Sequence, residues 1–268
     1  MTPPPLQLHP TALVDAGARL AEGVRVGPYA VVEEDADVGP GCELRAHSVV
    51  KRHTRLGAGN TVHEHAVLGG EPQDLSWDGA PTALVVGERN RIREGVTLHR
   101  SARPGGATVV GSDCFLMAYV HVAHDCRLGD RVILANNVAL AGHVEIGERA
   151  FISGGVVVHQ FCRVGRLAMV GGNTKVVQDC LPFVVTDGHP GRARGLNVVG
   201  LRRAGVGLAQ VRALREAYRL LLRSALPRDA ALALLSEIGD PLVDELAAFV
   251  RASRRGFHRA ARSTDQAD

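Results

Sequence analysis

An aliphatic residue returns at every sixth position over most of the chain, and this period limits the fold more than any other feature. The series runs from Leu8 to Leu68 without a break and, after two interruptions, continues to Val176. An amphipathic helix repeats every ~3.6 residues and a strand every ~2, so neither produces this period. A short fixed period is typical of a β-solenoid, in which each turn of the chain lies on the one before.

Three such hexads form one triangular coil of 18 residues. Successive coils stack at about 4.8 Å, so roughly nine or ten coils predict a prism on the order of 45 Å long. Glycine often follows the aliphatic residue, as at Gly39 and Gly147, where we expect a corner with positive φ. Every cysteine occupies the small position of a hexad, two before the aliphatic position (Pro182 stands there after Cys180), so we interpret them as packing residues: Cys42, Cys114, Cys126, Cys162 and Cys180.

The repeat also divides the chain. It predicts a β-helix over residues 1–186, with loop insertions at 70–83 and 100–107. Such loops on a rigid scaffold are where binding residues collect. After a link rich in Gly, Pro and Arg, apolar spacing and proline boundaries predict helices over 207–226, 228–238 and 241–253. We assign residues 187–262 to a C-terminal helical domain and 263–268 to a disordered tail.

Composition excludes several classes of function. The net charge of +3 and the pI of about 8.7 are too mild to indicate nucleic acid, although a weakly basic surface suits an acidic partner protein. No apolar run of about 18 residues is present to insert stably into a membrane. No signal peptide is visible, and the five cysteines form no C-x-x-C pair. We therefore expect a cytoplasmic protein with reduced thiols.

The coil length places histidines together. Residues 18 apart lie above one another, which gives two neighbouring columns: His124, Gly142 and Gln160, then Asp125, His143 and Phe161. His159 adjoins Gln160, so three imidazoles gather at one edge of three coils. An imidazole held by a carboxylate is a suitable general base. Gly142 offers a backbone N–H to an oxyanion. No Ser or Cys is placed as a nucleophile beside His124, so we expect no covalent acyl-enzyme.

Two other interpretations compete with this one. The spacing His121-x-x-His124 also permits a zinc site shared across a groove, as in γ-class carbonic anhydrases. A third hypothesis is a catalytically silent scaffold or cargo-binding solenoid. Four further histidines are interpreted as surface residues: His47, His53, His63 and His65.

Longer strings resemble the UDP-N-acetylglucosamine O-acyltransferase family, which begins lipid A biosynthesis. Similarity extends from about His9 to Arg254, and its most specific part is the run from His121 to Phe161. The matching strings are Gly70-Glu71-Pro72-Gln73-Asp74-Leu75, Asn90-Arg91-Ile92-Arg93-Glu94, Thr97-Leu98-His99-Arg100, Ala123-His124-Asp125-Cys126, Leu134-Ala135-Asn136-Asn137, Leu140-Ala141-Gly142-His143-Val144, Val158-His159-Gln160-Phe161-Cys162, Met169-Val170-Gly171-Gly172 and Gly195-Leu196-Asn197.

The resemblance implies a mainly β fold, a left-handed parallel β-helix followed by a small C-terminal α-helical domain. It implies transfer of a 3-hydroxyacyl chain from acyl carrier protein to the 3-hydroxyl of UDP-N-acetylglucosamine, without a cofactor. By this resemblance His124 would be the base, Asp125 would orient it, and the Gly142 N–H would support the oxyanion. The resemblance also implies a homotrimer with active sites in grooves between subunits.

Further roles follow from the same resemblance. Six residues are expected to line or adjoin the sugar–nucleotide pocket: Asp74, His99, His121, His143, His159 and Gln160. Asn197 and Arg203 are expected to approach the nucleotide from the C-terminal side. Met169 and Gly172 would form the acyl-chain ruler, and glycine at position 172 implies a long donor of the tetradecanoyl kind.

Three positions depart from the family pattern. Ser76 stands where the family has Lys, Val199 where it has an acidic residue, and Ala204 where it has a second Arg. All three belong to the nucleotide side of the expected site. They leave open a 3-amino analogue of the UDP-sugar, acylated on nitrogen, as the acceptor.

Overall fold

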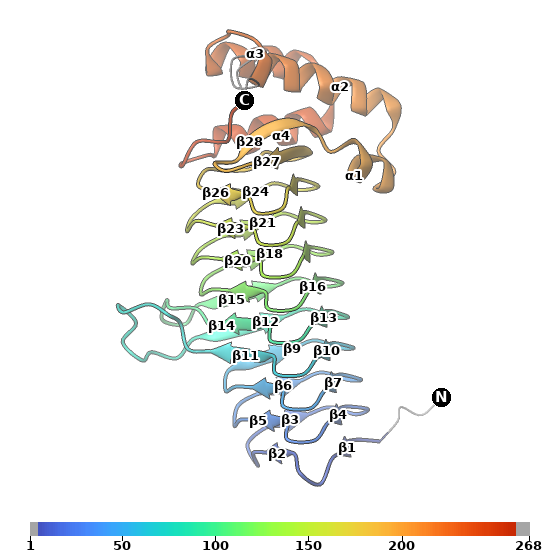
Figure 1. The fold of residues 1–268 in the computed structure, drawn as a ribbon, viewed down its shortest axis with the longest axis vertical. Coiled ribbons are helices and arrows are strands. Elements are labelled where there is room, and N and C mark those ends of the chain that lie inside the picture. The colour runs from blue at the N-terminus through green and yellow to red at the C-terminus, as the bar shows by residue number, and fades with distance from the viewer. Residues whose placement is uncertain (1–4, 261–268) are drawn as a thin grey trace.

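Three β-sheets form the faces of a triangular prism, and a helical segment covers its C-terminal end (Figure 1). The computed structural model describes residues 5–260. Strands of successive coils pair in parallel, for example with His121 opposite Ala139. This confirms the left-handed parallel β-helix. One sheet has nine strands among the described residues, in agreement with the expected number of coils.

We name the sheets A, B and C. Sheet A consists of β1 (Gln7–Leu8), β4 (Arg25–Val26), β7 (Glu43–Leu44), β10 (Thr61–Val62), β13 (Arg91–Ile92), β16 (Phe115–Leu116), β19 (Ile133–Leu134), β22 (Phe151–Ile152), β25 (Met169–Val170), β27 (Val184–Asp187) and β28 (Arg192–Leu196). Sheet B consists of β2 (Leu13–Val14), β5 (Val31–Val32), β8 (Val49–Val50), β11 (Val67–Gly70), β14 (Thr97–His99), β17 (His121–Val122), β20 (Ala139–Leu140), β23 (Val157–Val158) and β26 (Lys175–Val176). Sheet C consists of β3 (Arg19–Leu20), β6 (Asp37–Val38), β9 (Thr54–Leu56), β12 (Ala83–Val86), β15 (Ala107–Val110), β18 (Arg127–Leu128), β21 (Glu145–Ile146) and β24 (Arg163–Val164).

The six-residue repeat forms the interior of the prism. Its aliphatic residues between Val26 and Val176 are all buried and make one continuous core with the small residues that precede them. All five cysteines are buried and free, which confirms their interpretation as packing residues. Because burial of the aliphatic layers supplies most of the stabilisation, the edges of the prism are free to carry polar side chains.

The glycines after the aliphatic residues do not have the positive φ that the sequence predicted, except at Gly69. Positive φ falls instead three residues after the aliphatic position, as at Asp125 (φ 60°). A Cβ built on Gly147 would lie 2.5 Å from the backbone nitrogen of Arg166, and one on Gly39 would lie 2.7 Å from a backbone carbon. The prediction was therefore wrong in its reason: glycine is needed because stacked backbones approach closely.

The link rich in Gly, Pro and Arg that precedes the predicted helices contains a β-hairpin. Strand β28 pairs antiparallel with β27, which continues sheet A beyond β25. The predicted domain boundary between residues 186 and 187 falls inside β27, and the division into domains stays a prediction. The predicted tail at 263–268 lies outside the described residues.

The C-terminal helices appear close to the predicted ranges. They are α1 (Val198–Arg203), α2 (Leu208–Tyr218), the π-helix η1 (Arg219–Arg223), α3 (Arg228–Glu237) and α4 (Pro241–Arg251). The helix α1 was not predicted. Arg166 on the β-helix forms an ion pair of 2.7 Å with Glu245 of α4 and attaches the helices to the prism. No helix within residues 5–260 has the length and apolar character needed to cross a membrane.

Candidate active site

Histidines gather where sheet B turns into sheet C. We call the stacked turns 123–126, 141–144 and 159–162 the histidine edge. The His143 N–H donates to the His124 carbonyl over 3.0 Å, and the Phe161 N–H donates to the Gly142 carbonyl over 3.2 Å. These bonds stack the turns in register and bring His124 and Gly142 together, as the 18-residue coil predicts.

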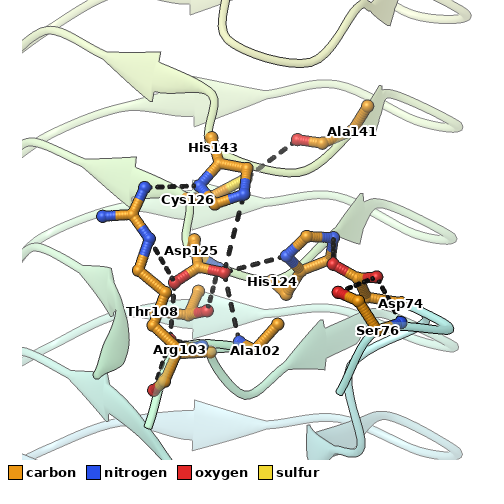
Figure 2. Close-up of polar contacts among 11 residues, drawn as sticks. Asp74, Ser76, Ala102, Arg103, Thr108, His124, Asp125, Cys126, Ala141 and His143 are labelled. Atoms are coloured by element: carbon orange, nitrogen blue, oxygen red, sulfur yellow. Dashed lines mark hydrogen bonds and ion pairs between the residues drawn. The ribbon is translucent and has the colours of Figure 1, made fainter. Parts of the chain in front are cut away.

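His124 and Asp125 form a hydrogen-bonded pair (Figure 2). The Nδ1 of His124 lies 2.9 Å from Oδ2 of Asp125, so the ionised carboxylate accepts a proton-bearing Nδ1 and leaves the lone pair on Nε2. The imidazole lies over Gly142, where a built Cβ would be 2.5 Å from Cε1 and 2.6 Å from Nε2. Glycine at position 142 therefore creates the space that the ring occupies.

Asp125 is itself held by the loop at 100–107. Its side chain is only 7 % exposed, and it accepts hydrogen bonds from the Ser101 hydroxyl (2.5 Å) and the Ala102 N–H (3.1 Å). Burial works to raise the pKa of Asp125, but the hydrogen bonds from Ser101, His124 and Ala102 outweigh it and leave the pKa below its usual value. The carboxylate therefore stays ionised beside the imidazole.

His143 adjoins the pair on the next coil. Its ring is edge-on to His124 at 5.1 Å and stacks on Phe161 at 4.5 Å. Arg103 donates to His143 Nδ1 over 3.1 Å, which puts the ring proton on Nε2, 3.9 Å from an Asp125 oxygen. Burial lowers the pKa of His143 and the Arg103 guanidinium lowers it further, against the opposing charge of Asp125, which favours the neutral imidazole.

His99 and His121 lie on neighbouring strands of sheet B, edge-on at 5.0 Å. The Nδ1 of His121 lies 2.8 Å from the Thr97 hydroxyl. Burial lowers the pKa of His121 and brings that of His99 to about 4. These neutral rings are hydrogen-bonding groups beside His124 and add no positive charge to it.

Asp74 reaches the histidine edge from the loop at 70–83 (Figure 2). One of its oxygens lies 4.0 Å from Nε2 of His124, on the side away from Asp125. The other accepts the backbone N–H (2.9 Å) and the hydroxyl (2.8 Å) of Ser76, which lower the pKa of Asp74. Ser76, a departure from the family pattern, thus orients a predicted site residue.

Other predicted site residues lie apart. His159 lies against the carbonyl of Gln160 in the third turn, with Nδ1 3.1 Å from that oxygen. Asn197 caps α1 by accepting the Gly200 N–H over 3.0 Å. A cavity of about 530 Å³ on the face of sheet A is lined by Asn197, Arg203 and Met169, and by two of the departures, Val199 and Ala204. Gly172 lies in a turn between sheets A and B. Sheet A is the face opposite the histidine edge, so a single chain does not unite these residues with His124.

The atoms of His124, Asp125 and His143 lie close enough for a metal ion, whereas His121 of the zinc hypothesis is not part of this group. Both Asp125 oxygens accept hydrogen bonds, and His143 Nδ1 accepts one from Arg103. A guanidinium beside the proposed ligands disfavours a cation there. The donor set fits a proton-transfer pair better than a zinc centre.

Sequence reasoning missed Ser101, Arg103 and Thr108, all of which support Asp125. Thr108 accepts the Asp125 backbone N–H over 2.8 Å. The length of the loop at 100–107 could have revealed Ser101. The loop lengthens its coil to 24 residues, as the pairing of Thr97 with His121 shows, and Ser101 therefore lies in the same column as Asp125.

A groove of about 620 Å³ begins at the outer side of the histidine edge, beside His143 and Asp125. It runs along sheet C to the residues after α4, and its lining is rich in arginine: Arg103, Arg127, Arg163, Arg254 and Arg255. Three acidic residues also line it, Asp125, Glu145 and Asp179, so the five arginines leave a net positive charge that favours an acidic partner.

Comparison with known proteins agrees with this architecture. The family model described as UDP-N-acetylglucosamine O-acyltransferase, domain 2, matches residues 179–258, and that of the bacterial transferase hexapeptide matches residues 107–142. The acyl-[acyl-carrier-protein]–UDP-N-acetylglucosamine O-acyltransferase of Paraburkholderia xenovorans is 49% identical over 94% of this chain and 99% of its own length. The protein of the same name from Alkalilimnicola ehrlichii is also 49% identical, with the same coverage.

Solved structures agree as well. The crystal structure of UDP-N-acetylglucosamine O-acyltransferase from Moraxella catarrhalis has a TM-score of 0.90 at 40% identity and covers 94% of this chain and 99% of that one. The corresponding structure from Acinetobacter baumannii has a TM-score of 0.91 at 37% identity, with the same coverage. The chain is therefore an acyltransferase that belongs to the UDP-N-acetylglucosamine O-acyltransferase family.

Proposed function

We propose that the protein transfers a 3-hydroxyacyl chain from acyl carrier protein to the 3-hydroxyl of UDP-N-acetylglucosamine, the first step of lipid A biosynthesis in the cytoplasm. The names of the relatives give both substrates. The observation that carries the chemistry is the His124 imidazole, held by Asp125 on one side and lying over Gly142 on the other.

In this proposal His124 acts as the general base. Its Nε2 takes the proton of the sugar hydroxyl as the oxygen attacks the thioester carbonyl, and Asp125 stabilises the imidazolium that forms. The Gly142 N–H donates no hydrogen bond among the described residues, which leaves it free for the oxyanion. The tetrahedral intermediate collapses by breaking the carbon–sulfur bond, and the imidazolium returns its proton to the departing thiolate.

Direct transfer without an acyl-enzyme is supported by the state of Cys126, the thiol nearest in sequence to the pair. This thiol is fully buried and donates to the Ala141 carbonyl over 3.1 Å. Burial raises the pKa of Cys126 to about 12, so almost no thiolate exists at neutral pH. Ser101, the hydroxyl on Asp125, is buried as well.

Mass spectrometry with purified protein tests the acceptor and the bond formed. We expect acylated UDP-N-acetylglucosamine when a 3-hydroxytetradecanoyl carrier protein is the donor, and an ester that mild base cleaves. The alternative is the 3-amino analogue, which would give a base-stable amide. Preferred turnover of the analogue would move the acceptor assignment to it, and no acyl product with either sugar would contradict the proposed function.

The outer faces of the prism support a homotrimer. Side chains that point outward from sheet C are mostly charged, such as Arg19 and Asp37, which pair at 3.3 Å. Those of the C-terminal half of sheet A are largely apolar: Phe115, Ile133, Phe151 and Met169. At the level of this apolar half, sheet B presents Ala139 and Val157 between His121 and Lys175. Packing sheet A of one copy on sheet B of the next forms a heterologous contact that closes into a ring.

Such a ring would also complete the site. Sheet B ends at the histidine edge, so a neighbour's sheet A, with its Asn197, Arg203 and Met169, would face His124 across a groove. We expect light scattering to give the mass of a trimer at assay concentrations. A monodisperse monomer with full activity would contradict the shared site.

Gly172 is proposed to set the acyl-chain length. A Cβ built there meets only the Gly154 carbonyl oxygen at 3.5 Å, an ordinary contact, so a side chain fits without unfolding the coil. Gly172→Met is expected to lower kcat/KM for the tetradecanoyl donor relative to a decanoyl donor by about 10²-fold, because each buried CH₂ is worth about 0.8 kcal/mol. Competition between the two donors measures this ratio, and an unchanged ratio would place the ruler elsewhere.

A further inference from the structure

Ser101 is a buried hydroxyl behind the His124–Asp125 pair. Its residue is 0 % exposed, and its Oγ lies 2.5 Å from Oδ1 of Asp125. The same Oγ accepts the N–H of Arg103 over 3.0 Å. The Arg103 N–H occupies a lone pair, and the other acceptor near the hydroxyl proton, the Arg103 carbonyl, is 3.5 Å away, so the proton goes to the nearer carboxylate. The hydrogen bond therefore runs from Ser101 to Asp125.

The surrounding loop is built to hold this hydroxyl in place. The 24-residue coil puts Ser101 in the same column as Asp125, one turn earlier. Gly106, across the loop, leaves room for it, since a Cβ there would lie 2.5 Å from the Ser101 Oγ. The Ala102 N–H then reaches the second oxygen of Asp125 over 3.1 Å.

We propose that Ser101 is a positioning residue for acyl transfer: its hydroxyl fixes the Asp125 carboxylate so that Oδ2 faces Nδ1 of His124. This inference rests on the proposed role of His124 as the base. Ser101 donates a hydrogen bond to Oδ1 of Asp125, and this bond keeps Oδ2 directed at the imidazole. Without Ser101, the Ala102 N–H alone would hold the carboxylate from the loop, and the carboxylate would hold the ring less firmly over Gly142.

The charges around Asp125 give the proposal a signature in pH. Asp125 is faced by His124 at 2.9 Å, by His143 at 3.9 Å and by Arg103 at 3.9 Å. The His124 ring is also faced by the Asp74 carboxylate, 4.0 Å from Nε2, and this charge is the same in the wild type and in the Ser101 variant. The Ser101 proton stabilises the full negative charge that the pair carries when His124 is neutral. It matters less once His124 is protonated, because the imidazolium then balances the carboxylate. Without the hydroxyl, the pair holds its proton more tightly.

The test is Ser101→Ala in the full-length protein. We expect kcat to fall about tenfold, as for the loss of a hydrogen bond to a charged group. We also expect the acidic limb of the pH profile of kcat/KM to move up by about 0.5–1 pH unit. Ser101→Gly removes the same hydroxyl and replaces the alanine variant should that variant fail to fold.

Ser48→Ala is the matched control. Ser48 is equally buried and its hydroxyl donates over 2.7 Å to the Arg45 carbonyl, far along the prism from His124. Its loss should lower the melting temperature similarly without moving the pH profile. If Ser101→Ala behaves like Ser48→Ala, with kcat and the profile unchanged, the positioning role is overturned. The proposed function would still stand in that case, because it fails only if the wild-type protein forms no acyl product.

Discussion

His124→Ala is expected to lower kcat by about 10²–10⁴ while the melting temperature stays close to that of the wild type. The imidazole projects from a turn at the prism edge and is not part of the aliphatic core, so its removal leaves the packed layers intact. The measurement is kcat with saturating UDP-sugar and acyl carrier protein, together with a melting curve and the zinc content.

A matched control is His47→Ala, which removes an exposed corner imidazole from an N-terminal coil, where it stacks between Tyr29 and His65. This variant should keep full activity. An unchanged kcat in His124→Ala would remove the general-base assignment. Stoichiometric zinc that disappears with the mutation would instead favour a metalloenzyme.

Gly142→Ala should cost about 10²–10³ in kcat, nearly as much as losing the base, although it adds one carbon atom. The new Cβ would lie 2.5 Å from Cε1 of His124, so the ring must leave its place over residue 142. Alanine keeps the backbone N–H, and the loss of activity therefore reports the displaced imidazole and the altered approach to the oxyanion.

The contrast is Gly207→Ala at the start of α2, where the nearest atom to a built Cβ is a Gln210 oxygen 3.9 Å away. Single-turnover kinetics with each variant separates chemistry from binding. Retained turnover in Gly142→Ala would show that the space above this glycine is not needed for the base.

The period of six predicted most of the prism because a solenoid converts spacing into position. Once each coil is 18 residues, Gly142 must lie over His124 and Phe161 must lie over His143, and the backbone bonds between these turns show both. The aliphatic core and the buried cysteines follow from the same rule. The repeat therefore left few alternative positions for the residues of these coils.

Prediction was weaker wherever the repeat stopped. The hairpin β27–β28 is short and Gly/Pro-rich, and its pairing depends on the free edge left by β25, which no local pattern reveals. Helix α1 has six residues, too few for a clear apolar period, and begins at the cap formed by Asn197. The contacts of Ser101 and Arg103 depend on how an inserted loop folds back. The sequence could therefore indicate which coil position these residues occupy, but not which atoms they contact.

The β27–β28 hairpin that ends sheet A also determines how far Asn197 and Arg203 lie from His124 along the prism axis. It ends the parallel stack a fixed number of coils beyond His124, and α1 starts directly after it. An extra 18-residue coil inserted between these levels would leave every local contact intact, yet it would raise Asn197 and Arg203 by about 4.8 Å relative to the base. The distance along the prism axis between His124 and the pair Asn197 and Arg203 can therefore change only in whole steps of one strand spacing.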